Sequence, residues 1–186
     1  SDPNTPFSAI SDAGRIFIAH EDFANGDLYV SEFDSTGGLV DTPVTGGTNI
    51  GNVQGIEYME GENSLLIKGK SGSFKLLDLS SNTVSSWAGT ITGSGFPDGP
   101  VQRPGTSTVY YCKDNLWSLD AGSLANDDEK KFELFNFGSR QRTIAGVTGN
   151  GKVVIANGDG ESAIFDGETG EKEKTFPFAV AAAFLD

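Results

Sequence analysis

Cysteine, histidine and long apolar runs are nearly missing from this chain of 186 residues. Its one cysteine, Cys112, cannot form an intramolecular disulfide, and its one histidine, His20, is far from it in sequence. We therefore expect Cys112 to be a small buried apolar residue and not a histidine-activated nucleophile. The longest apolar run, AVAAAFL (179–185), is too short to span a bilayer. Neither a disulfide scaffold nor membrane insertion is expected, and no residue pattern indicates a cofactor.

Basic residues are also scarce: 13 stand against 26 acidic ones, which gives a net charge of −13. A surface of this kind repels nucleic acid and anionic membranes, so we expect neither as a partner. The one basic cluster, Arg140-Gln141-Arg142, is interpreted as a solvated loop. The acidity favours solubility or a basic protein partner.

Windows with a 3.6-residue apolar face are missing as well, so almost no helix is expected. What is present is a repeat of turns. Four segments have an apolar run that ends in aspartate, followed by small turn residues and a second extended run. These aspartates are Asp34, Asp78, Asp120 and Asp166, separated by 44, 42 and 46 residues. An aspartate carboxylate can accept backbone N–H bonds from the next residues, so we predict that these four are structural turn residues.

Two further runs precede each of these segments, which makes four runs per repeat. The nearer of the two is nearly all apolar, at 15–20, 64–69, 108–113 and 152–157, which predicts strands buried on both faces. Four strands per repeat at this period are typical of a propeller blade. We predict an all-β, single-domain small β-propeller of four to five blades, with a β-sandwich as the alternative. The approximate repeats are 7–47, 48–89, 90–140 and 141–178, followed by an extra strand at 179–186.

The turn in IFDGETGEKEKTF, with Asp166, Thr169 and Gly170, resembles that of the YVTN and quinoprotein-like β-propeller repeats. The turn at 34–37 matches with a shorter loop, whereas Asp78 and Asp120 keep only the aspartate and polar turn residues. The resemblance implies the propeller fold and not a quinone cofactor, because the quinone enzymes with such repeats are much longer. Phe176 stands where that motif has tryptophan.

The stretch NGDGESAIFDGE (157–168) can be read as a calcium loop or as a hairpin. Its oxygen-bearing side chains are close to the EF-hand register, but Ser162 replaces the required glycine. The repeat makes ESAIFD a strand, which would separate Asn157 from Glu168 by about 20 Å. We therefore predict a hairpin that binds no calcium tightly.

His20, Glu21, Asp22 and Asp27 offer a weaker metal-binding pattern, for which the plainer interpretation is an acidic hairpin loop. Trp117 is predicted to lie in the core and Trp87 at the end of an outer strand. No spacing among the acidic residues singles out a catalytic pair, and we expect no enzyme activity.

These features favour a non-catalytic structural or interaction propeller, most concretely a decoration or cement-type protein on an assembled particle such as a phage capsid. The chain shows no signal peptide and no glycosylation sequon, which fits a virion or a particle made in the cytoplasm. The alternative is a secreted or surface propeller that binds a sugar or peptide, since Ser1 can be a processed end. The expected partner is a protein or further copies of the chain, in an oligomer or larger assembly.

The final residues, AVAAAFLD (179–186), align with the first strand of a blade. This strand can close the ring against the first blade or add to a neighbouring subunit. We predict the second, with Val180, Ala182 and Phe184 as partner contacts.

Overall fold

The computed structural model describes residues 6–69, 73–86, 100–112, 115–123, 130–132 and 142–178. Within these ranges the chain forms sixteen β-strands and one short 3-10 turn, Ala121–Ser123, with no α-helix. No helix in this described part is long and apolar enough to cross a membrane. The all-β prediction is confirmed.

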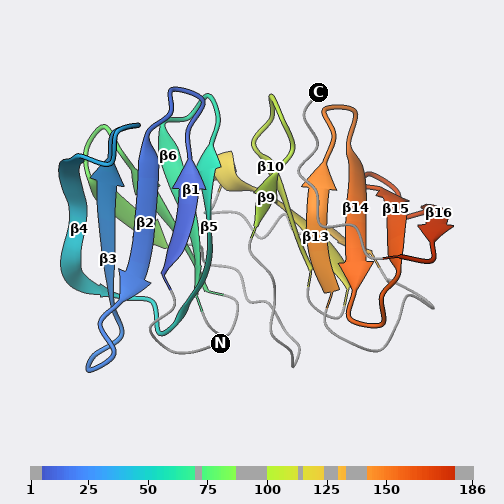
Figure 1. Cartoon of the computed structure of the whole chain (residues 1–186), viewed down its shortest axis with the longest axis horizontal. Helices are drawn as coiled ribbons and strands as arrows, with labels where there is room; N and C mark the ends of the chain where they lie inside the picture. Colours follow the sequence, from blue (N-terminus) through green and yellow to red (C-terminus); the bar gives the residue numbers. More distant parts are fainter. Residues whose placement is uncertain are drawn as a thin grey trace. The chain divides into compact units, whose positions relative to one another are not determined.

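The strands form four antiparallel sheets, each of four strands in sequence order. Two sheets belong to one compact unit of the chain and two to the other. The first unit is coloured from blue to green in Figure 1. Its first sheet contains β1 (Phe7–Ile10), β2 (Ile16–Glu21), β3 (Asp27–Phe33) and β4 (Leu39–Asn49). Its second sheet contains β5 (Val53–Met59), β6 (Ser64–Gly69), β7 (Phe74–Asp78) and β8 (Thr83–Ser86).

The core of the first unit lies between its two sheets, where β1 and β2 contact β5. Phe17, Ala19 and Val30 of the first sheet share one apolar cluster with Leu65 and Ile67 of the second. These five side chains have no exposed surface, because the two sheets cover them from both sides. Burial of this kind stabilises the unit by roughly 1.5–3 kcal/mol for each large apolar side chain.

The second unit repeats the arrangement with the third and fourth sheets. The third sheet contains β9 (Val101–Gln102), β10 (Thr108–Cys112), β11 (Leu116–Asp120) and β12 (Lys130–Phe132), and the fourth contains β13 (Arg142–Val147), β14 (Lys152–Asn157), β15 (Ser162–Asp166) and β16 (Lys172–Phe176). Tyr110, Cys112 and Leu116 pack with Val153 and Phe165 between these sheets. Cys112 is fully buried and Trp117 is 8% exposed, which confirms both as core residues.

The second strand of the first sheet differs from its prediction. Every residue of β6 is buried, as expected for a strand covered on both faces. In β2, by contrast, Phe17 and Ala19 are buried while Ile16 and Ile18 are only half-buried and His20 is exposed. The prediction that all four second strands are buried on both faces is therefore wrong for β2, because in the described structure the second sheet covers only one face of the first.

Candidate interaction surface

The four repeated aspartates form turns between the third and fourth strands of the sheets. Asp34 Oδ1 accepts bonds from the N–H of Thr36 at 2.8 Å and of Gly38 at 2.9 Å. Asp78, Asp120 and Asp166 do the same with backbone N–H groups two residues ahead, at 2.7, 3.0 and 2.9 Å. The predicted structural role of the turn aspartates is confirmed.

These bonds lower the pKa values of the turn carboxylates Asp34 and Asp78. The hydroxyl of Thr36 donates to Asp34 at 2.6 Å and, with the turn N–H groups, holds the pKa of Asp34 below its usual range. The backbone N–H of Ser80 does the same for the pKa of Asp78. Each bond favours the ionised carboxylate, so these turns are strongest when the aspartates are charged.

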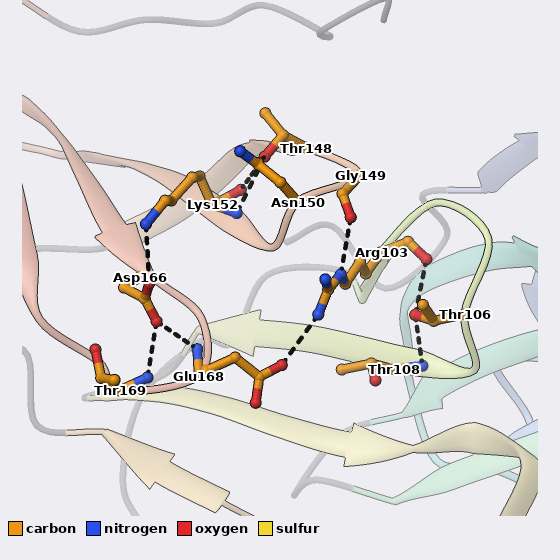
Figure 2. A network of polar contacts seen from close by, with 10 residues as sticks. All are labelled: Arg103, Thr106, Thr108, Thr148, Gly149, Asn150, Lys152, Asp166, Glu168 and Thr169. Atoms are coloured by element: carbon orange, nitrogen blue, oxygen red, sulfur yellow. Dashed lines mark hydrogen bonds and ion pairs between the residues drawn. The ribbon is translucent and has the colours of Figure 1, made fainter.

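The fourth sheet adds ion pairs to its aspartate turn. The Lys152 ammonium donates to Asp166 Oδ2 at 2.8 Å (Figure 2). It also donates to Glu173. The hydrogen bond from Lys152 is the main cause of the depressed pKa of Asp166. In return, the hydrogen bonds to Asp166 and Glu173 raise the pKa of Lys152 to about 12. Lys152 and Asp166 are therefore held in their charged forms.

An arginine then links the third sheet to the fourth. Arg103, in the turn between β9 and β10, donates to the Gly149 carbonyl at 3.1 Å and to Glu168 Oε1 at 3.0 Å (Figure 2). Its own carbonyl accepts from the Thr106 hydroxyl, which in turn receives the N–H of Thr108. The hydrogen bonds of Arg103 therefore connect the third and fourth sheets.

In the first unit a similar connection between the two sheets is made by Arg15, which follows the turn between β1 and β2. The guanidinium donates to Glu32 Oε1 at 3.3 Å and to Asn63 Oδ1 at 2.6 Å, and Asn63 lies in the turn between β5 and β6. The same group lies 5.1 Å from the ring centre of Phe17 and 5.8 Å from that of Tyr58. The sequence reasoning missed both arginines, although each lies beside a predicted turn between the first two strands of its repeat.

The stretch 157–168 is the predicted hairpin. β14 pairs antiparallel with β15, and Asn157 Oδ1 accepts the N–H groups of Asp159 and Glu161 at 3.0 Å each within the connecting turn. Glu168 lies beyond the far end of β15, where it pairs with Arg103. The strand therefore separates the two ends of the EF-hand-like pattern.

The acidic loop around His20 is likewise a hairpin turn. His20 stacks on Tyr29 with ring centres 5.3 Å apart. Glu21 is buried and points elsewhere, accepting the N–H of Val53 at 2.9 Å and the Asn52 amide at 3.0 Å. Among the described residues no three histidine, cysteine or carboxylate side chains gather as a possible metal site.

Hydrogen bonds within the turn between β2 and β3 hold its backbone in place. The N–H of Ala24 donates to Asp22 Oδ1 at 2.9 Å, and the N–H of Gly26 donates to the Asp22 carbonyl at 2.7 Å. Asn25 Oδ1 accepts the N–H of Asp27 at 3.0 Å. The glycine has φ 72, a left-handed conformation that the turn requires and that few other residues adopt.

Two hydrogen bonds from the end of β4 and the residue after it also hold this turn. The Asn49 amide donates to the Asn25 carbonyl at 2.6 Å, and the N–H of Ile50 donates to the Gly26 carbonyl at 3.1 Å. Between these fixed points the ring of Phe23 is 70% exposed. The structure thus presents a large aromatic side chain on a hydrogen-bonded turn whose sequence runs from Asp22 to Asp27. The sequence pattern predicts a turn here but does not indicate that its aromatic residue faces solvent.

The predicted partner contacts Val180, Ala182 and Phe184 lie outside the described residues, as does the whole segment 179–186. Of the other predicted features, Trp87, Arg140 and Gln141 also lie outside them, whereas Arg142, the last residue of the basic cluster, begins β13. These predictions stay untested.

Four consecutive four-stranded antiparallel sheets, each in sequence order, define a β-propeller. Among solved structures, the chain is similar to the Myceliophteria thermophila Cps50 (Swd1) beta-propeller domain, with a TM-score of 0.67 and 12% sequence identity. The match covers 96% of this chain and 57% of that one, so the chain spans little more than half the length of its structural neighbour. No protein-family model and no curated protein sequence matches the chain. The β-propeller fold is confirmed, in preference to the β-sandwich.

Proposed function

We propose that this chain is a non-catalytic β-propeller that binds another protein through the turn between β2 and β3. The observation that carries the proposal is the 70% exposed ring of Phe23 on a turn whose backbone is held by several hydrogen bonds. Aromatic anchors of this kind supply much of the binding energy at protein interfaces. Because the turn is already ordered, binding need not order it first.

The surroundings of Phe23 indicate the chemistry of its partner. Phe23 lies between Asp22 and Asp27 in the sequence of the turn, and the whole chain carries a net charge of −13. A complementary surface would have an apolar pocket for the ring and basic residues around its rim. Attraction between the two charged surfaces would raise the association rate more than the affinity, and salt would weaken it.

The non-catalytic part of the proposal rests on how the polar side chains are used. Lys152 pairs with both Asp166 and Glu173, and Arg103 pairs with Glu168. Cys112 is buried among apolar residues, and His20 is stacked on Tyr29. These assignments give each of these groups a structural role.

Affinity capture from the source cell tests this proposal. Bait protein carrying Phe23→Ala should lose a captured protein that the unaltered chain retains, whereas Phe23→Tyr should keep it because the ring remains. Val40→Ala is the matched control, since Val40 is an apolar residue that is 59% exposed in β4. Identical captured proteins with all four baits would contradict a role for this turn.

The sequence supports a finer form of the proposal: the partner belongs to an assembled particle such as a phage capsid, made in the cytoplasm, and the repeats are of the YVTN type. The support is the acidic composition, the presence of only one cysteine, which excludes an intramolecular disulfide, and the aspartate–threonine–glycine turn at 166–170. Cosedimentation of the purified chain with such particles tests it, and a chain that stays in the supernatant would contradict it.

A further inference from the structure

The chain that joins the first sheet to the second passes directly against the turn that carries Phe23. We call residues 49–53, from the last residue of β4 to the first residue of β5, the connecting segment. A Cβ placed on Gly26 would lie 3.0 Å from the Asn49 amide nitrogen and 3.3 Å from the Gly51 carbonyl oxygen. The turn and the connecting segment belong to the same compact unit of the chain.

The start of the connecting segment holds the turn through two donors. The Asn49 amide donates to the Asn25 carbonyl at 2.6 Å, and the N–H of Ile50 donates to the Gly26 carbonyl at 3.1 Å. Because these two carbonyls are consecutive, the two hydrogen bonds fix the half of the turn that follows Phe23.

The other end of the connecting segment is held by Glu21, which is only 6% exposed. Its two carboxylate oxygens accept the N–H of Val53 at 2.9 Å and the Asn52 amide at 3.0 Å. A buried carboxylate is costly unless donors of this kind satisfy it, so the pairing is favoured. Because Glu21 immediately precedes Asp22, the first residue of the turn, these bonds join the turn to the connecting segment at a second point.

The second sheet fixes the connecting segment in turn. The side chains of Ile50 and Val53 are buried in the apolar cluster that the first two sheets share. Val53 pairs with Gly69 of β6, and the Ser73 hydroxyl donates to the Ile50 carbonyl at 3.5 Å. A Cβ placed on Gly69 would lie 2.4 Å from the same carbonyl oxygen. Ile50 thus contacts the second sheet through its carbonyl and the Phe23 turn through its N–H.

We propose that the connecting segment positions the Phe23 turn for binding, with Asn49 and Glu21 as the positioning residues. The inference rests on the proposed function, in which Phe23 binds a protein. A turn that is free to move loses conformational freedom when it meets a partner, and the lost entropy opposes binding. The bonds from the connecting segment restrict the turn beforehand. Glu21 is buried, so it acts through the turn and not by touching the partner.

Hydrogen exchange of the free chain, followed by mass spectrometry, tests the positioning without a partner. Asn49→Ala should speed exchange in the peptides that cover residues 22–27 by about 3- to 10-fold, as expected for the loss of one hydrogen bond. Ser86→Ala is the matched control, because it removes the exposed hydrogen bond from Lys75 at 2.7 Å in the second sheet. This control should leave exchange in the turn unchanged.

Variants at Gly69 and Glu21 test the two more distant links. Gly69→Ala belongs to the second sheet and should still speed exchange in the turn, because its methyl group would displace the Ile50 carbonyl. Glu21→Ala should do the same, whereas Glu21→Gln should restore slow exchange, since a glutamine oxygen can accept the N–H of Val53. Glutamine that behaves like alanine would overturn the role given to this hydrogen bond. Circular dichroism verifies that each variant is folded.

Calorimetric titration with the protein captured by the unaltered chain completes the test. Asn49→Ala should bind this protein about 3- to 10-fold more weakly, in parallel with its faster exchange. Phe23→Ala should bind it more weakly without faster exchange in the turn. Unchanged exchange or unchanged affinity in Asn49→Ala overturns the positioning alone. Phe23→Ala that binds as tightly as the unaltered chain contradicts the proposed function itself, and the inference falls with it.

Discussion

At the scale of single residues, the turn aspartates show how a polar side chain specifies a β-fold. Each of the four satisfies the backbone N–H groups of a tight turn that would otherwise have no partner within the sheet. The sequence predicted this because the aspartate, the apolar run before it and the period could all be read directly. The sequence could not predict which carboxylates also find a cation, since Lys152 reaches Asp166 only after β14 and β15 have paired.

Replacement of Asp78 by alanine should lower the melting temperature by about 2–4 °C, as for the loss of one local cap. The matched Asp78→Asn variant keeps an acceptor oxygen for the N–H of Ser80 and should recover most of the loss. Differential scanning calorimetry on the unaltered chain and the two variants measures this. A loss of the same size in both variants would show that the charge, and not the hydrogen bond, stabilises the turn.

The direction of the pKa shifts predicts how stability changes with pH. The depressed pKa values of Asp34, Asp78 and Asp166 mean that their contribution is present above about pH 4 and is lost as the pH falls through the lower folded values. The pKa of Lys152 is raised to about 12, so its contribution is present below its ordinary value of 10.5 and is lost as the pH rises through about 12.

We therefore expect the melting temperature to fall on acidification below about pH 4, and to fall less steeply in Asp166→Asn than in the unaltered chain. Thermal melts between neutral and strongly acidic pH measure the two slopes. Parallel curves would mean that Asp166 titrates alike in the folded and unfolded chain.

At the scale of strands and turns, the sequence was most informative where the pattern is local. The second strands are β-branched or aromatic in large part, and all four pair as predicted. The burial of β2 was misjudged because its composition matches that of β6, while the difference lies in what covers the sheet. The Phe23 turn was predicted as a turn, but its anchoring by Asn49 and Ile50 comes from residues more than twenty positions away, which no local pattern reveals.

The glycine of the turn at 166–170 illustrates a contact between neighbouring sheets. Gly170 has φ 73, and a Cβ placed on it would lie 2.5 Å from Cβ of Phe132 in the third sheet. Gly160 has φ 90, but a Cβ there would meet nothing within 4 Å. Glycine is thus required at position 170 both by the neighbouring sheet and by the positive φ, and at position 160 by the positive φ alone.

Gly160→Ala should consequently cost about 1–2 kcal/mol of unfolding free energy, from the left-handed conformation. Gly170→Ala should cost about 1–3 kcal/mol more, because the methyl group would displace the Phe132 ring. Denaturant unfolding of the two variants gives both values. Equal costs would indicate that β12 moves away freely and that this contact contributes little to the joining of the two sheets.

At the scale of the whole molecule, the chain is a β-propeller assembled from repeated four-stranded sheets. The repeat period, the four strands and the turn chemistry predicted this architecture from the sequence. The surfaces that distinguish the chain could not be predicted in this way. The exposure of the Phe23 ring depends on which atoms the rest of the fold leaves in contact with water.

Under the proposed function, Phe23 is the anchor through which this propeller binds its protein partner. The affinity of the purified captured partner should therefore be measured for the unaltered chain and for Phe23→Ala, by calorimetric titration at two salt concentrations. We predict a loss of about 30-fold or more in the variant, as expected for an anchor at the centre of an interface, and weaker binding of the unaltered chain at the higher salt concentration. Equal affinities for the two chains would contradict the account.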